Sequence, residues 1–160
     1  MATEIERKYL VLNKKFKADA YKVVTIKQGF LNSNPHRTVR IRITDKSGLI
    51  TVKGMGSADG TTRFEWEKEI DLSEANELLV LCEPTIIEKK RYLVKTDTHI
   101  IEVDEFYGSN SGLTVAEIEL SELHERIDKP EWLGKEITGI PKYYNAMLSQ
   151  NPFITWKDKN

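Results

Sequence analysis

The sequence predicts a mainly β protein, α+β by class, whose strands form an eight-stranded antiparallel closed β-barrel with a few flanking helices. The dominant hydrophobic period is two, which is typical of strands. The strand-like segments are short and closely spaced, and turn residues separate them. Closing such a sheet removes the unpaired edges of an open one. The length of 160 residues suits one compact unit, so we expect a single domain over residues 1–160.

The expected strands follow from alternation and from the turns between them. Residues 38–44 alternate cleanly, and Asp45-Lys46-Ser47-Gly48 is a hairpin turn that leads into a return strand. We expect strands over residues 4–12, 22–31, 38–44, 49–54, 62–71, 86–95, 99–106 and 113–120.

Other segments leave the strand period. We expect a helix with Ser73 as its N-cap that runs to about Cys82, because Pro84 cannot continue it. Residues 121–124 are interpreted as a short helix start, and residues 142–149 as a last helix.

Composition excludes several classes of protein. A net charge of -1 gives no global basic field, so no nucleic-acid partner is expected. The sequence begins with no basic, apolar leader, and no apolar run approaches the ~20 residues of a membrane span. Cys82 is the only cysteine, so no intrachain disulfide is expected. We therefore expect a cytoplasmic protein that has no membrane partner.

Charged side chains recur at every second position of the strands, which places them on one face of each strand. Apolar residues such as Val39 and Ile41 occupy the opposite face. The charged faces hold Glu4, Glu6 and Lys8; Arg40 and Arg42; Lys53, beside Thr51; Arg63, Glu65 and Glu67; Lys89 and Arg91; Glu102 and Asp104; and Glu117 and Glu119.

A half-buried sheet with a solvated polar face would explain any one of these strands. Together they indicate something else, because like charges two residues apart repel unless a counter-charge lies between them. We expect the charged faces to line the interior of the barrel. The apolar residues Phe64, Trp66, Ile101 and Val103 would then face outward, onto helices or onto a second subunit in a homodimer.

The charges also indicate the ligand. The acidic set is rich in oxygen and lacks His or Cys partners, which favours hard cations such as Mg²⁺ or Mn²⁺. Arginine pairs favour phosphate through bidentate hydrogen bonds, and lysines add point charges. Carboxylates and cations in one cavity suit a phosphate chain that bridges to a metal.

The ordered set of motifs resembles the CYTH-domain family of triphosphate tunnel metalloenzymes, and in particular its short, inorganic triphosphatase-like bacterial members. The hallmark of that family, Glu-x-Glu-x-Lys, is matched by Glu4, Glu6 and Lys8. The later matches are Arg40-x-Arg42, Thr51-x-Lys53, Glu65-x-Glu67, Lys89-x-Arg91, Glu102-x-Asp104 and Glu117-x-Glu119, with Gln28-Gly29, Trp132-x-Gly134 and Tyr143-x-Asn145 as further similarities.

The resemblance implies a tunnel that binds a triphosphate and hydrolyses it with a divalent metal, Mg²⁺ or Mn²⁺. It implies that Glu4, Glu6 and Glu119 hold the activating metal. Asp104 and Glu117 would serve a second metal or position water. The phosphate-binding set would be Lys8, Arg40, Arg42, Lys53, Arg63, Lys89 and Arg91, and Glu65, Glu67 and Glu102 would line the tunnel further.

The general base stays open at this point. No Ser-His-Asp or Cys-His arrangement is visible, so water is expected to attack phosphorus directly. The base would be Glu117 or Asp104, or else Lys89 if neighbouring cations lower its pKa.

The leading expectation is a triphosphatase that cleaves inorganic tripolyphosphate to pyrophosphate and phosphate, because a short chain leaves little room for a nucleoside pocket. The alternatives are a thiamine or nucleoside triphosphatase, a CYTH-type adenylate cyclase, and, from another class, a non-catalytic polyphosphate- or nucleotide-binding module. The sequence departs from its short relatives at Phe30, where they often have Tyr, and at residues 139–142, where relatives can have a charged run.

Overall fold

The structure is a computed structural model and describes residues 3–159. The strands are β1 (Thr3–Val11), β2 (Ala20–Asn32), β3 (Arg37–Ile43), β4 (Gly48–Gly56), β5 (Thr62–Ile70), β6 (Ile87–Lys95), β7 (Ile100–Tyr107), β8 (Thr114–Glu119) and β9 (Leu133–Glu136). The α-helices are α1 (Phe16–Asp19), α2 (Leu72–Val80) and α3 (Asn145–Gln150), and the 3-10 helices are η1 (Gly108–Asn110), η2 (Pro141–Tyr143) and η3 (Phe153–Thr155).

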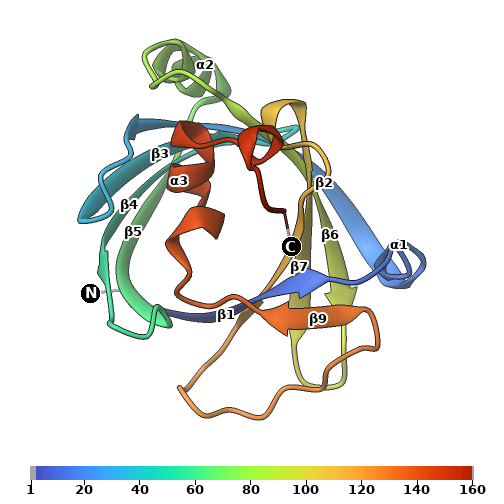
Figure 1. Ribbon diagram of the computed structural model, residues 1–160. Helices are drawn as coiled ribbons and strands as arrows, with labels where there is room; N and C mark the ends of the chain where they lie inside the picture. The colour runs from blue at the N-terminus through green and yellow to red at the C-terminus, as the bar shows by residue number, and fades with distance from the viewer. Residues whose placement is uncertain (1–2, 160) are drawn as a thin grey trace.

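Eight strands form a closed antiparallel ring in the order β5-β4-β3-β2-β6-β7-β8-β1 (Figure 1). The ring closes where the start of β1 pairs with β5, with Glu4 opposite Arg63. The ninth strand, β9, adds to the second half of β1. The predicted eight-stranded antiparallel barrel is therefore confirmed.

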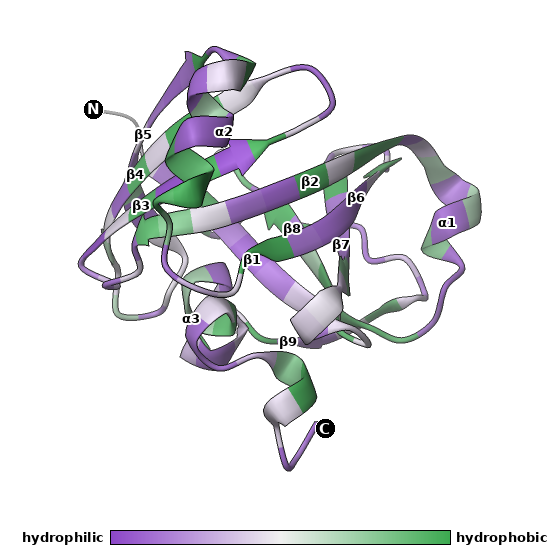
Figure 2. Ribbon diagram, turned by 90° about the horizontal axis from the view of Figure 1, so that it is seen from above, coloured by the Kyte–Doolittle hydropathy of each residue, from purple (hydrophilic) through white to green (hydrophobic). Residues whose placement is uncertain are grey.

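Alternation along each strand sends charged side chains into the ring and apolar ones outward, and Figure 2 shows hydrophilic and hydrophobic residues following one another along the strands. On the outer face of β1, β6, β7 and β8, apolar residues pack beneath α1 and the segment that carries β9. This outer core contains Ile101 and Val103 with Phe16 and Trp132, all buried. The chain itself therefore covers two of the residues that we expected to face outward onto helices or a partner.

Helix α2 covers the outside of β2, β3 and β4. The helix can lie this close because Gly48 has no side chain: a Cβ there would stand 2.4 Å from the Cβ of Ala75. Ile41 on β3 is fully buried, whereas Phe64 and Trp66 on β5, beyond the helix, remain exposed.

The C-terminal segment lies across one opening of the ring (Figure 1). Its side chains Leu148, Phe153 and Trp156 form a second core with residues from the strands, such as Phe30 on β2. Phe30, noted above as a departure from short relatives, is therefore a packing residue. The buried contacts fix α3 in place at the end of the tunnel.

The structure corrects several expectations. The N-cap of α2 is Asp71 and not Ser73, because the chain turns into the helix directly after β5. Residues 121–124 form turns and not a helix. The last helix is shorter than predicted, because Pro141 begins a separate 3-10 turn before α3. Strand β9 and helix α1 were not predicted at all. Within residues 3–159, no helix has the length and apolar character needed to cross a membrane.

Candidate active site

A cavity of about 260 Å³ lies inside the ring and is lined by side chains from most of its strands. Seven cations and two carboxylates contribute to this lining, so the cavity favours an anion. The charged lining residues are Glu6, Lys8, Arg40, Arg42, Lys53, Arg63, Lys89, Arg91 and Glu117.

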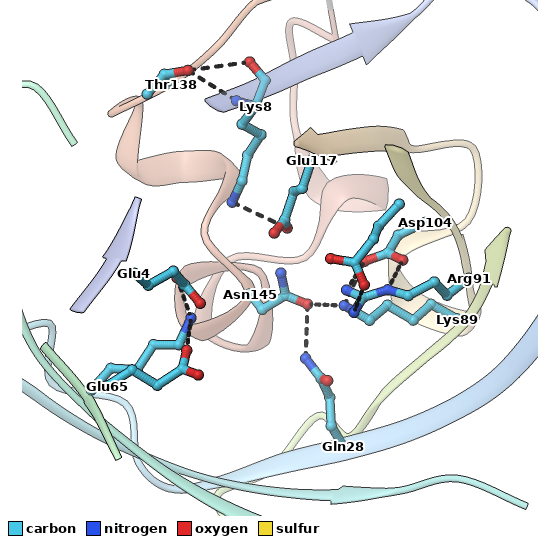
Figure 3. A network of polar contacts seen from close by, with 12 residues as sticks. Glu4, Lys8, Gln28, Glu65, Lys89, Arg91, Asp104, Glu117, Thr138 and Asn145 are labelled. Atoms are coloured by element: carbon cyan, nitrogen blue, oxygen red, sulfur yellow. Dashed lines mark hydrogen bonds and ion pairs between the residues drawn. The ribbon is translucent and has the colours of Figure 1, made fainter. Parts of the chain in front are cut away.

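Lys89 on β6 lies at the buried end of this cavity, with a side chain that is 1% exposed. Its Nζ is 2.7 Å from Asp104 Oδ2 and donates a hydrogen bond of 2.9 Å to Asn145 Oδ1 (Figure 3). Burial lowers the pKa of Lys89 to about 7, and the neighbouring arginines Arg91 and Arg42 contribute to that shift while Asp104 opposes it. A lysine with this pKa exchanges protons near neutral pH.

Arg91 and Asp104 face each other from adjacent strands, β6 and β7. The Arg91 guanidinium makes two hydrogen bonds to the Asp104 carboxylate, of 2.8 and 2.9 Å, and a third of 2.8 Å to Glu102. Burial opposes ionisation of Asp104, but Arg91 and Lys89 outweigh it and hold its pKa at about 2. Asp104 is therefore a permanent anion that holds two cations.

Two pairs of carboxyl groups meet around β1. Burial and the nearby Glu117 raise the pKa of Glu6 well above its ordinary value, and these two side chains share a hydrogen bond. A hydrogen bond with Glu4, together with burial, raises the pKa of Glu65 to about 7. Lys53 Nζ lies 2.9 Å from Glu4 and 3.3 Å from Glu65. Carboxyl groups this close need a proton or a cation between them.

Arg40 and Arg42 on β3 crowd the opposite wall. Arg40 Nη2 is 3.2 Å from Thr51 Oγ1 and 3.6 Å from Glu67, while its buried Nε has no hydrogen-bond partner among the described residues. Burial and the adjacent Arg40 lower the pKa of Arg42 to about 9. An unpaired buried donor and two neighbouring arginines both favour the binding of an anion.

The structure separates some residues that the sequence grouped together. Glu102 and the exposed Glu119 line a second, more open cavity of about 750 Å³ beside the β6–β7 turn. Arg63 lines the first cavity, but its guanidinium donates hydrogen bonds of 3.0 and 2.7 Å to the carbonyl oxygen of Gly54. Across residues 3–159, no three His, Cys, Asp or Glu side chains converge into a ready-made metal site.

Sequence reasoning gave no role to two amides in the cavity network. Gln28 is fully buried on β2, and it hydrogen-bonds both Arg42 and Asn145, at the start of α3. A fully buried glutamine must find hydrogen-bond partners, so Gln28, with the apolar Ile26 and Phe30 two positions away on either side, was the available signal. Asn145 was noted only as part of Tyr143-x-Asn145, and no local pattern gave its contacts, because these come from strands that are distant in sequence.

Comparison with known proteins places these features in a family. Residues 2–146 match the CYTH domain family. An inorganic triphosphatase of Acetivibrio thermocellus is 42% identical over 159 residues, which cover 99% of this chain and 100% of the relative. An inorganic triphosphatase of Nitrosomonas europaea is 34% identical over 92% of this chain and 97% of the relative.

Solved structures agree with this placement. A crystal structure of an inorganic triphosphatase has a TM-score of 0.65 and 30% identity, covering 93% of this chain and 95% of that chain. A protein from Pyrococcus horikoshii OT3 shares the fold with a TM-score of 0.60 at 18% identity, over 74% of this chain and 79% of that one. The chain belongs to the CYTH domain family.

Membership of this family implies dependence on a divalent metal, and the residues present fit one. The facing carboxyl pairs Glu6–Glu117 and Glu4–Glu65 provide oxygen ligands, which hard cations prefer. A divalent cation held by these carboxylates would offset their mutual repulsion, as the Lys53 ammonium already does between Glu4 and Glu65. Because the protein supplies no complete ligand set within residues 3–159, phosphate oxygens and water would complete the coordination.

Proposed function

We propose that this chain hydrolyses inorganic tripolyphosphate to pyrophosphate and phosphate, acting as a single CYTH domain over residues 1–160. One observation carries the proposal: seven cations and two facing carboxyl groups line one small cavity inside a closed ring. A polyanion would neutralise the cations, and Glu6 and Glu117 would hold a divalent metal that offsets their own charge. The two relatives named as inorganic triphosphatases support the same activity.

The cations bind and orient the phosphate chain. Arg40 and Arg42 offer planar donor groups that match phosphate oxygens in pairs, and Lys8 and Lys53 add point charges from β1 and β4. Lys89 and Arg91 extend the basic wall from β6, and Arg63 adds a further cation at the rim. Fixed positive charge around the reacting phosphorus stabilises the charge that develops in phosphoryl transfer.

Glu4, Glu6 and Glu117 would hold the divalent metal, for which Mg²⁺ or Mn²⁺ is proposed because the donors are all oxygen. A metal held by these residues would act as a Lewis acid and would supply positive charge against the phosphate chain. Glu119 and Asp104 are proposed as further ligands of the metal. Glu119 lies in the second cavity, and Asp104 already holds Lys89 and Arg91.

Among the candidate bases, Lys89 is favoured. Asp104 has a pKa of about 2, and the cations around Glu117 hold its pKa well below the ordinary value against the effect of burial. Lys89, with a pKa of about 7, can take the proton of an attacking water. The water oxygen forms a bond to a terminal phosphorus, the bridging P–O bond breaks, and pyrophosphate leaves with the electron pair.

The size of the cavity favours a bare phosphate chain over an organic triphosphate. At about 260 Å³ it falls just below the roughly 300–1,000 Å³ of typical small-molecule pockets. A cytoplasmic location and a homodimer through the exposed β5 residues Phe64 and Trp66 remain further proposals; the single cysteine supports the first and the uncovered aromatic side chains support the second.

The test is phosphate release from tripolyphosphate, pyrophosphate, ATP and thiamine triphosphate, each with Mg²⁺, Mn²⁺ or EDTA. Metal-dependent release that is fastest from tripolyphosphate is expected. Faster turnover of ATP or thiamine triphosphate would reassign the enzyme to organic triphosphates. Tight tripolyphosphate binding without release from any compound would identify a binding module.

A further inference from the structure

A chain of side-chain hydrogen bonds connects the C-terminal segment to two cations of the cavity. Lys89 Nζ donates to Asn145 Oδ1 at 2.9 Å, and Gln28 Nε2 donates to the same oxygen at 2.8 Å. Arg42 Nε donates to Gln28 Oε1 at 2.9 Å. Figure 3 shows Asn145 between Gln28 and Lys89, with its amide nitrogen turned away from Lys89.

The chemistry of the two ends fixes the direction of every bond in this chain. A protonated lysine and an arginine only donate, so each must meet an acceptor. Asn145 therefore presents Oδ1 to Lys89, which leaves Gln28 to donate to the same oxygen through Nε2. Gln28 then has Oε1 free to accept from Arg42. All three bonds are satisfied in one orientation of the amides.

Asn145 also completes the environment of Lys89. Asp104 Oδ2 takes one N–H direction of Nζ at 2.7 Å, and Asn145 Oδ1 takes a second. The ring of Phe106 lies 5.4 Å from Nζ. Lys89 also lines the cavity, so the remaining direction of Nζ is the one available to a ligand there. Removing Asn145 would let the ammonium group rotate away from that direction.

A neutral acceptor is needed at this position. Asp104 already offsets part of the positive charge of Lys89 and Arg91. A second carboxylate beside Lys89 would cancel charge that a phosphate chain needs. An amide holds the lysine in place and leaves its charge unchanged.

We propose that Asn145 is a positioning residue: one neutral amide oxygen orients Lys89 directly, and Arg42 through Gln28, towards the same phosphate chain. The inference rests on the proposed function and extends it to the C-terminal segment. Because the packing of Leu148 and Phe153 fixes α3 across the ring, docking of that segment and orientation of the two cations occur together.

The experiment compares Asn145→Ala and Asn145→Asp with the wild type in steady-state hydrolysis of tripolyphosphate. Loss of the acceptor in Asn145→Ala should lower kcat by about 30- to 100-fold and change KM less than about threefold. Asn145→Asp keeps an acceptor of the same shape but adds a negative charge. The added carboxylate should also raise the pKa of Lys89 and move the pH optimum upward, so the two proteins are compared at their own optima, where Asn145→Asp should keep kcat within about threefold and raise KM by about tenfold or more.

Gln150→Ala is the matched control, because Gln150 joins the same helix to Glu83 at 2.8 Å and to Ser33 at 3.2 Å without touching Lys89. This variant should lower the melting temperature and keep kcat and KM within about twofold. If Gln150→Ala lowers kcat as much as Asn145→Ala does, the role of Asn145 is merely structural and the inference is overturned. Wild-type kinetics in both Asn145 variants would also overturn it.

Calorimetric binding of tripolyphosphate to the same proteins separates this inference from the proposed function. A wild type that binds but does not hydrolyse tripolyphosphate would refute the proposed hydrolysis alone. In that case Asn145→Asp should still weaken binding by about tenfold or more, and Asn145→Ala by less than about threefold. Equal binding by all three proteins would overturn the positioning role.

Discussion

Replacing Lys89 with Met should make the protein more stable and far less active. Lys89 is 1% exposed, and its pKa is lowered from 10.5 to about 7. At about 1.4 kcal/mol per unit, this shift corresponds to roughly 4–5 kcal/mol between the two protonation states. The lost hydrogen bond to Asn145 offsets about 1 kcal/mol, and the lost ion pair with the buried Asp104 offsets roughly 1.5–3 kcal/mol. The net expectation at pH 7 is a gain of about 1–2 kcal/mol in the free energy of unfolding.

The gain in the free energy of unfolding of the Met variant should decrease as the pH rises. Because the folded pKa is lower than the unfolded one, the unfolded chain binds more protons between pH about 7 and 10.5. The cost of burying Lys89 therefore fades as the pH rises through that window, and the advantage of the Met variant should shrink with it. If Lys89 is the general base, kcat should fall by about 10²- to 10⁴-fold at neutral pH.

Urea denaturation of wild type and Lys89→Met at pH 7 and pH 9.5 tests the stability prediction, and steady-state rates test the activity prediction. Lys89→Arg is the control, since it keeps a cation that cannot act as a base near neutral pH. A Met variant that is less stable than wild type at pH 7, or whose advantage does not change with pH, would refute the electrostatic argument. A Met variant with near-normal kcat would refute the role of Lys89 in the reaction.

Three further changes follow from the same geometry. Glu6→Gln should abolish metal-dependent release of phosphate while leaving the fold intact by circular dichroism, because an amide cannot replace the carboxylate as a metal ligand; unchanged activity would defeat the metal assignment. Arg42→Ala should raise KM for tripolyphosphate by about tenfold or more through the loss of a buried cation, and a normal KM would count against its phosphate role. Gly48→Ala should lower the free energy of unfolding by about 1–3 kcal/mol, because the new methyl would stand 2.4 Å from the Cβ of Ala75; equal urea midpoints would show that α2 shifts freely.

The ring could be predicted from the sequence because every long strand alternates. Residues 38–44, for example, show both the inward arginines and the outward aliphatic side chains without tertiary information. Strand β9 could not be predicted, because Leu133–Glu136 is only four residues long and forms by pairing with the end of β1. The N-cap of α2 was missed because Asp71 and Ser73 are both acceptable capping residues, and the end of β5 decides between them.

The candidate site was predictable in composition but not in layout. Period-two spacing identifies the inward charges, yet it does not give their height along the ring. Glu119 is directly opposite Glu6 in the strand register, but it opens onto the second cavity. Gln28 and Asn145 meet across 117 positions of the chain, so no local pattern could join them.

The central claim is metal-dependent cleavage of a phosphate chain inside the ring. The most direct test is ³¹P nuclear magnetic resonance of tripolyphosphate with the wild-type protein, with Mg²⁺ and then with EDTA. The account predicts that pyrophosphate and phosphate accumulate in equal amounts with the metal and that neither forms with EDTA. Resonances of tripolyphosphate that broaden on binding with Mg²⁺ but never decay, together with no phosphate release in a colorimetric assay with Mn²⁺, would contradict it.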